Sequence, residues 1–177
     1  GDYNVYLNDP RNINLGKKLI TNKKILIEKE RLKEINETEY HEILINHTTP
    51  YSPFDILENK SLLLENNFDN LNAIDWDKGC YVGQEITARM KYRGLLKKKL
   101  YALKIKSGDV LEGDELIVDN KKIGTIVSKA NSNIFAALNI NFVNEIKNKN
   151  QNLVINDSLS FDFLNWKFFS IKTYWNY

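Results

Sequence analysis

One short segment of this sequence combines a thiol, two glycines and charged side chains. Residues 78–85 read Lys-Gly-Cys-Tyr-Val-Gly-Gln-Glu, and Cys80 is the one cysteine of the chain, so its thiol has no partner for an internal disulfide. Lys78 adds positive charge near the sulfur, while Gly79 and Gly83 permit positive φ and the close approach of a ligand. These neighbours make Cys80 a candidate for a functional thiol. The alternatives are that the cysteine is a small buried hydrophobic residue and that the glycines only allow the chain to turn.

A helix is predicted to follow this segment, from about residue 83 to residue 93, and to end at Gly94. The N–H groups and the dipole at its first turn favour an anion, including a thiolate. Glu85 and Arg89 have the spacing of an i,i+4 ion pair. The buried stripe of this helix is predicted to consist of Ile86 and Met90.

The segment and its flanks resemble the signature of the YgfZ-type folate-binding proteins, which are relatives of the glycine cleavage T-protein. The string Lys-Gly-Cys-Tyr-x-Gly-Gln-Glu carries the resemblance. Further matches are Asp9-Pro10-Arg11, Leu15-Gly16, Leu64-Glu65 and Leu71 before it, and Thr87-Ala88-Arg89-Met90-Lys91 and Arg93-Gly94 after it. The resemblance is densest over residues 64–94, and beyond residue 95 only the strand pattern agrees. The chain is expected to lack the N-terminal part of such a protein.

The resemblance implies a T-protein-like fold that holds tetrahydrofolate in a central cavity and supports iron–sulfur enzymes, including one that thiolates tRNA. Its partners would be folate and iron–sulfur client proteins, with a tRNA link through a client enzyme. Cys80 would be the functional thiol. The residues expected to bind the folate are Glu65, Lys78, Tyr81, Gly83, Gln84, Glu85, Arg89 and Arg93. For Glu65 the alternative is a solvated or salt-bridged carboxylate. The implied compartment is the bacterial cytoplasm, or the mitochondrial matrix in a eukaryote.

A basic cluster lies between Ile86 and Lys99, where no acidic residue occurs. Its members are Arg89, Lys91, Arg93, Lys97, Lys98 and Lys99. Such a cluster suits the anionic glutamate tail of a folate or the phosphates of RNA, and a solvated linker is the alternative. A noncatalytic RNA-binding barrel is therefore one competing function, although no RNA-binding signature accompanies the cluster.

A T-protein-type aminomethyltransferase is a second competing function, and it is disfavoured. Asn46 stands where the T-protein has a glutamate that grips the pterin, and an amide cannot replace a carboxylate in that role. The catalytic aspartate of the T-protein is expected in the N-terminal part that this chain lacks. No metal site is predicted, because one thiol cannot hold an iron–sulfur cluster by itself. His41 and His47 are interpreted as structural or surface histidines.

The elements that must position the thiol form two regions, predicted as domains at residues 1–94 and 95–177. The expected fold class is α+β: the C-terminal part of a T-protein-like folate-binding domain, followed by a small antiparallel β-barrel. In the first region we expect an opening strand that ends at Pro10, and then either a hairpin or two short strands at residues 19–21 and 25–27. A helix is predicted from an N-cap at Thr38 to a point before Pro50.

The second region has short apolar runs separated by turn residues, which is typical of a barrel. The predicted strands are 100–105, 115–118, 122–128, 134–140, 153–155, 159–163 and 166–173. Asp119-Asn120 fits a two-residue hairpin turn, and residues 144–152 are predicted as a mobile loop. The chain has 177 residues, 42% of them hydrophobic, and a formal charge of +2, so no strong field marks a nucleic-acid or membrane protein. No apolar run is long enough for a transmembrane helix.

Overall fold

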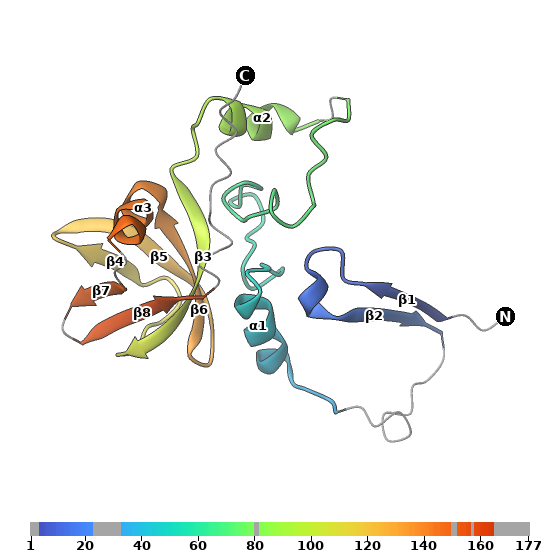
Figure 1. The fold of residues 1–177 in the computed structure, drawn as a ribbon, viewed down its shortest axis with the longest axis horizontal. Helices are drawn as coiled ribbons and strands as arrows, with labels where there is room; N and C mark the ends of the chain where they lie inside the picture. Colours follow the sequence, from blue (N-terminus) through green and yellow to red (C-terminus); the bar gives the residue numbers. More distant parts are fainter. Residues whose placement is uncertain (1–3, 23–32, 80–81, 150–151, 157, 165–177) are drawn as a thin grey trace.

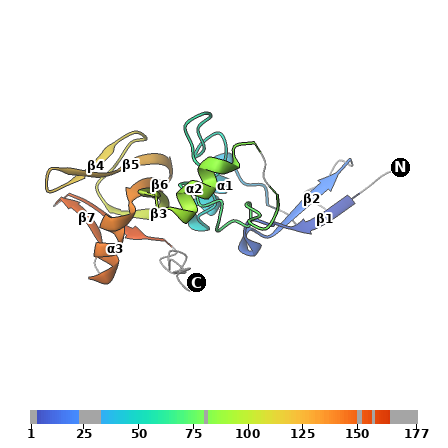
Figure 2. The same ribbon diagram turned by 90° about the horizontal axis from the view of Figure 1, so that it is seen from above.

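The computed structural model describes residues 4–22, 33–79, 82–149, 152–156 and 158–164. It confirms the predicted α+β class: an antiparallel β-barrel lies at one end and a separate two-stranded hairpin at the other, with helix α1 (Glu37–Asn46) between them and helix α2 (Gln84–Tyr92) away from both sheets (Figure 1). Seen from above, the same elements form an elongated molecule (Figure 2). No helix in these ranges is both long and apolar enough to cross a membrane.

The barrel is built from six antiparallel strands in the order β4-β5-β6-β3-β8-β7. Their bounds are β3 Lys98–Ser107, β4 Glu115–Val118, β5 Lys121–Ala130, β6 Asn133–Asn139, β7 Leu153–Asn156 and β8 Leu159–Phe163. The edge strands β4 and β7 approach one another, so the sheet is nearly closed. All the predicted strands that fall in the described ranges are confirmed; the predicted strand 166–173 lies outside them. Asp119 and Asn120 form the expected turn, with φ of 49° and 60°.

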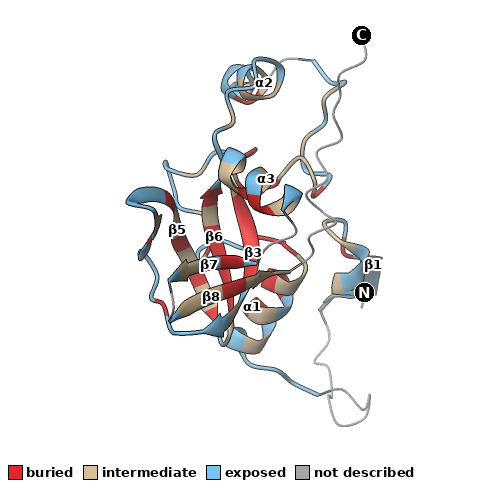
Figure 3. Ribbon diagram, turned by 60° about the vertical axis from the view of Figure 1, so that its left-hand side comes forward, coloured by how far each residue is buried: buried red, intermediate tan, exposed pale blue. Residues whose placement is uncertain are grey.

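Side chains that point into the barrel form the main core. Leu103, Ile134 and Phe161 are each fully buried in it. Helix α3 (Ile140–Asn148) covers this core, with Val143 and Ile146 one turn apart on its buried side (Figure 3). The prediction of a mobile loop at residues 144–152 is therefore wrong as far as residue 148. The polar residues there are the solvent side of an amphipathic helix, which the Asn139 side chain caps.

Helix α1 packs against the outside of the barrel, on strands β5 and β6. Its Ile45 belongs to a second buried cluster with Leu100, Ala102, Ala130 and Phe135. The N-cap is Asn36 rather than the predicted Thr38, because Asn36 and Glu39 form a reciprocal capping box: the Asn36 side chain accepts from the Glu39 N–H and the Glu39 carboxylate accepts from the Asn36 N–H. The helix ends well before Pro50, as predicted.

A buried carboxylate ties α1 to the barrel. The Asp55 side chain is 0% exposed, and its Oδ1 lies 2.9 Å from His41 Nε2 on α1. The same oxygen accepts a hydrogen bond from the Ser128 hydroxyl on β5, and Oδ2 accepts from the Tyr51 backbone N–H at 2.7 Å. Phe54 stacks on the His41 ring with centroids 5.0 Å apart. The structural interpretation of His41 is confirmed.

Strand β2 (Lys17–Thr21) pairs with the opening strand β1 (Asn4–Asn8). The strand predicted at residues 19–21 is confirmed as part of β2, whose described partner is β1, whereas residues 25–27 lie outside the described part. The opening strand ends immediately before Asp9-Pro10, as predicted.

Replacing Asp55 by alanine should lower the free energy of unfolding by about 3 kcal/mol, because three donors lose their buried acceptor. The measurement is urea unfolding of the purified chain. The matched control is Asp162→Ala, which removes an exposed ion pair with Lys106 and should cost less than about 1 kcal/mol. Equal losses in the two variants would contradict this account of Asp55.

Candidate functional site

The helix after the thiol segment forms as predicted. Helix α2 begins at Gln84, and its N-cap Gly83 has φ of 89°, a left-handed conformation that suits glycine. The helix ends at Tyr92 with Arg93 as its C-cap, and Gly94 follows at φ of 61°. Gly79 does not use the positive φ that a glycine permits, because it lies outside the left-handed region. The segment therefore turns at its second glycine, at the point where the helix starts.

The predicted thiol itself lies outside the described residues, as does Tyr81. The residues on either side of this pair are solvent-exposed: Lys78 and Gly79 before it, and Val82, whose relative exposure is 101%, after it. The side chain of Gln84 is half-buried at the first position of α2. The flanks of the segment are therefore open to water, and a ligand or partner can reach them.

Helix α2 is held at the base of this segment by an aromatic residue that sequence analysis missed. The ammonium of Lys91 lies 3.5 Å from the ring centroid of Trp76, and Tyr92 meets the same ring edge-to-face at 6.4 Å. Desolvation lowers the pKa of Lys91, and the nearby carboxylates of Asp69 and Asp77 oppose that shift. Trp76, which precedes the thiol segment, thus contacts the end of the helix that follows it. In the sequence, the one indication of this role was the position of Trp76 just before the segment.

This contact turns the other side of α2 outward. Thr87 is the residue of α2 that is buried, whereas Ile86 is 57% exposed and Met90 is half-buried, so the predicted buried stripe is wrong at Ile86. The helical spacing predicted that Ile86 and Met90 lie on one side of α2, but it could not determine whether that side faces the protein or the solvent. Glu85 and Arg89 form the predicted ion pair on this exposed side, and Arg93 at the C-cap is also exposed.

Glu65 lies at a different place from the α2 residues. It lines a cavity of about 160 Å³ between residues 55–66 and the outside of the barrel, and its Oε2 lies 3.3 Å from Lys98 Nζ. Its backbone oxygen accepts from the Leu100 N–H at 2.7 Å. The structure therefore agrees with the alternative interpretation of Glu65, that of a salt-bridged carboxylate. No residue of α2 lines this cavity. Among the described residues, Glu65 is therefore not brought together with the other predicted folate-binding residues, which lie between positions 78 and 93.

The basic cluster is partly neutralised by acidic residues from elsewhere in the chain. Lys98 pairs with Glu65, and Lys99 Nζ lies 3.2 Å from Asp69 Oδ2. Arg89 pairs with Glu85, and Lys91 covers Trp76. The cations that remain solvent-exposed with no ion pair to a described residue are Arg93 and Lys97. The cluster is therefore less cationic in space than in sequence.

Asn46, in the predicted pterin position, is the last residue of α1. Its Oδ1 accepts a hydrogen bond from Asn133 Nδ2 at 3.0 Å, so this amide contacts the barrel. Within the described ranges, no group of three or more histidine, cysteine, aspartate or glutamate side chains is placed to hold a metal ion.

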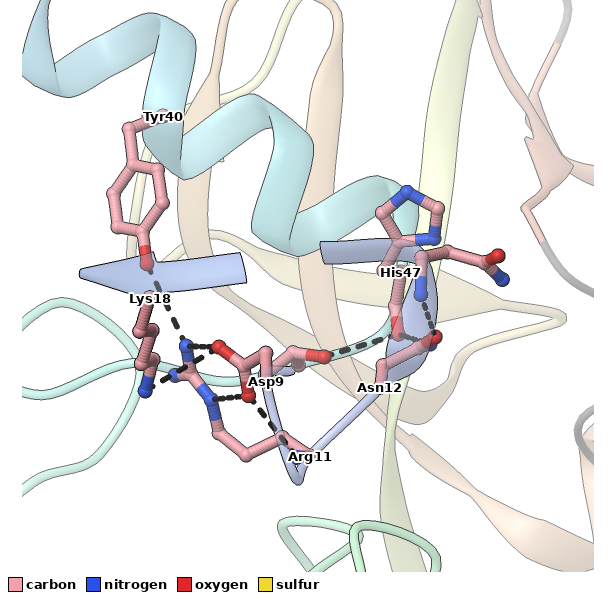
Figure 4. Close-up of polar contacts among 8 residues, drawn as sticks. Asp9, Arg11, Asn12, Lys18, Tyr40 and His47 are labelled. Atoms are coloured by element: carbon pink, nitrogen blue, oxygen red, sulfur yellow. Dashed lines mark hydrogen bonds and ion pairs between the residues drawn. The ribbon is translucent and has the colours of Figure 1, made fainter. Parts of the chain in front are cut away.

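The Asp9-Pro10-Arg11 element anchors the hairpin to α1 (Figure 4). Arg11 donates from Nε and from its terminal nitrogen to the two oxygens of Asp9, at 3.0 Å and 2.7 Å, and Lys18 Nζ lies 3.3 Å away. The hydrogen bonds from Arg11 hold the pKa of the buried Asp9 carboxyl well below its ordinary value, against the opposing effect of desolvation. Across this junction, Arg11 reaches the Tyr40 hydroxyl on α1 at 3.5 Å.

Comparison with known proteins finds mitochondrial proteins named iron–sulfur cluster assembly factor IBA57. The Dictyostelium discoideum homolog is 35% identical over 121 residues, which cover 64% of this chain and 30% of that protein. The mouse and human proteins are 31% and 30% identical over 101 and 102 residues, each match covering 56% of this chain and 28% of the relative. The chain thus spans less than a third of the length of these relatives. No protein-family model matches the sequence.

These relatives are T-protein-like proteins related to the YgfZ proteins. The resemblance found from the sequence agrees with this similarity, since the relatives named IBA57 are related to the proteins that the resemblance indicated.

The Asp9 carboxylate should make stability depend on pH. Its pKa is about 3.9 in an unfolded chain and lower in the folded one, so its contribution is full above about pH 5 and is lost as the pH falls through 4 toward the folded pKa. The Asp9→Asn variant should be less stable by about 1–3 kcal/mol at pH 6, and this difference should shrink at pH 3. Urea unfolding of both proteins measures it. A difference that stays constant over this range would contradict the prediction.

Proposed function

We propose that this chain is an accessory factor for the assembly, repair or activity of iron–sulfur proteins, with Cys80 as its functional thiol. The observation that carries the proposal is the similarity to proteins named iron–sulfur cluster assembly factors, 35% identical over 121 residues in the first of them. The mitochondrial matrix is the compartment that fits these relatives, all three of which are named mitochondrial. The alternative of a bacterial cytoplasm has no support from them.

The chemistry available to this chain is thiolate donation. A cluster is cargo here, and one thiolate supplies one of the roughly four ligands that a cluster requires. Cys80 would therefore share a cluster with a partner protein that provides the other ligands. The exposure of Lys78 and Val82 on either side supports access by such a partner, and the Lys78 charge favours the thiolate.

Tetrahydrofolate is the small molecule that the resemblance adds to this proposal, and the described residues fit it only in part. The predicted folate-binding residues divide between the cavity, where Glu65 lies, and the outer side of α2, where Glu85 and Arg89 lie. A cavity of about 160 Å³ is also smaller than the roughly 300–1,000 Å³ of most ligand pockets. A tRNA link would be indirect, through a client enzyme.

Yarrowia lipolytica has a protein named iron–sulfur cluster assembly factor IBA57 homolog, which is 37% identical to this chain over 65 residues. A strain that lacks this protein can test the role of the thiol. Expressed with a mitochondrial leader, this chain should restore the activity of [4Fe–4S] enzymes, and Cys80→Ala should reduce the restored activity at least about tenfold, because cluster ligation requires the thiolate. Ser107→Ala is the matched control, since Ser107 is exposed on β3, does not line the cavity and provides no metal ligand in this proposal. Full activity of Cys80→Ala would exclude the thiol from the function, and no restoration by the unmodified chain would exclude the function itself.

Folate binding has a separate test. Titration of the purified chain with tetrahydrofolate should quench tryptophan fluorescence to saturation, and Glu65→Gln should raise the apparent Kd, since a carboxylate hydrogen-bonds a pterin edge more strongly than an amide does. Lys121→Gln, an exposed change on β5, is the control. Quenching that does not saturate by millimolar folate would remove folate from the proposal and leave the thiol test unaffected.

A further inference from the structure

An apolar stripe runs along the outward side of α2 and continues past its end. Ile86 and Met90 are four residues apart, so they are neighbours on one side of the helix. The Leu95 N–H donates to the Met90 oxygen at 3.3 Å across the left-handed Gly94, which is the hydrogen bond of a Schellman motif. Such motifs bring the side chain after the glycine next to the last turn, so Leu95 extends the stripe.

Most of this stripe is exposed to solvent although its residue types favour burial, and Met90 at its middle is half-buried. Ile86 is 57% exposed, Leu95 52%, and Val82, which leads into the helix, 101%. Figure 3 shows α2 as a mostly exposed element at one extremity of the described molecule. Contiguous exposed apolar side chains on a soluble domain mark interaction surfaces.

The charges beside the stripe indicate the chemistry of what covers it. Arg89 and Arg93 follow Ile86 at i+3 and i+7, so they lie along the same side of the helix, and Lys97 follows Leu95. Glu85 is the one carboxylate of α2, and it pairs with Arg89. Arg93 and Lys97 remain exposed without an ion pair to a described residue, so this surface has an excess of positive charge.

We propose that this surface, formed by Ile86, Arg89, Met90, Arg93, Leu95 and Lys97 and here named the α2 outer face, docks an iron–sulfur protein whose own surface has an apolar patch rimmed by carboxylates. Charge complementarity selects such a partner, because an acidic rim would neutralise Arg93 and Lys97 while its centre covers the stripe. The aliphatic members of the face favour a protein over a nucleic acid, which would call for aromatic side chains that stack on bases.

The α2 outer face also explains how a partner would reach the thiol. Only four peptide units separate Cys80 from Gln84, so their Cα atoms are at most about 14 Å apart whatever path the chain takes. A protein that covers the first turn of α2 therefore stands close to the sulfur. The inference rests on the proposed function, because it names the partner that would share a cluster with Cys80.

The test uses a photo-crosslinking residue, benzoylphenylalanine, in the Yarrowia lipolytica strain described above. It replaces Ile86 in one version of the full chain and Ile117, which is 47% exposed on β4, in the control version. Position 86 should give at least about fivefold more adduct than position 117, with an acidic protein that has cluster-ligating cysteines. A second change, Lys97→Glu, should reduce this adduct at least about fivefold, whereas Lys104→Glu on the exposed surface of β3 should not.

Restoration of enzyme activity in the same strain distinguishes the docking proposal from the proposed function. Ile86→Glu should reduce the restored [4Fe–4S] enzyme activity at least about fivefold, whereas Ile117→Glu should leave it unchanged, with circular dichroism confirming that both variants fold. Equal adducts at positions 86 and 117, an adduct with nucleic acid, lipid or a second copy of this chain, or full rescue by Ile86→Glu would each overturn the docking proposal. Failure of the unmodified chain to rescue, with the acidic adduct still formed at position 86, would overturn the proposed function and leave the docking surface in place.

Discussion

The arrangement of this molecule depends on the buried carboxylate of Asp55. A carboxylate with no access to water must be fully hydrogen-bonded, and here the three donors come from α1, from the segment after α1 and from strand β5. Those donors are satisfied together only when α1 lies against the barrel at one position. The apolar contacts of Ile45 supply the attraction, whereas the polar bridge fixes the geometry. Glu65 and the cavity it lines follow from that position, because residues 55–66 continue from this bridge.

The other end of the thiol segment is held in a different way. Helix α2 has little buried surface of its own, and Trp76 contacts it by receiving Lys91 on its face and Tyr92 at its edge. Such contacts are weaker than core packing, so α2 is attached to the preceding segment more than to the barrel. A helix attached by one side presents the other side to solvent. That is the physical origin of the exposed apolar stripe, and it connects the fold to the partner surface proposed above.

Electrostatics in this chain are settled by contacts between residues far apart in sequence. Six cations with no acidic residue among them suggest a phosphate-binding surface when the sequence is read alone. Glu65 and Asp69, some thirty residues earlier in the chain, neutralise two of them. What remains is a modest excess of charge at Arg93 and Lys97 beside aliphatic side chains. This combination suits a protein surface with carboxylates better than a phosphate backbone.

The sequence by itself determined the features that depend on local interactions. The barrel strands follow from period-two alternation between turn residues, the Asp119-Asn120 turn from the tolerance of both residues for positive φ, and the bounds of α2 from Gly83 and Gly94. The thiol segment was recognised from its residue types, although its structure lies outside the described part. Sequence patterns could not predict which side of α2 is exposed, which strand pairs with β2, or which residue accepts a hydrogen bond from His41. Each of these features depends on contacts between residues that are distant in sequence, and such contacts form only in the folded chain.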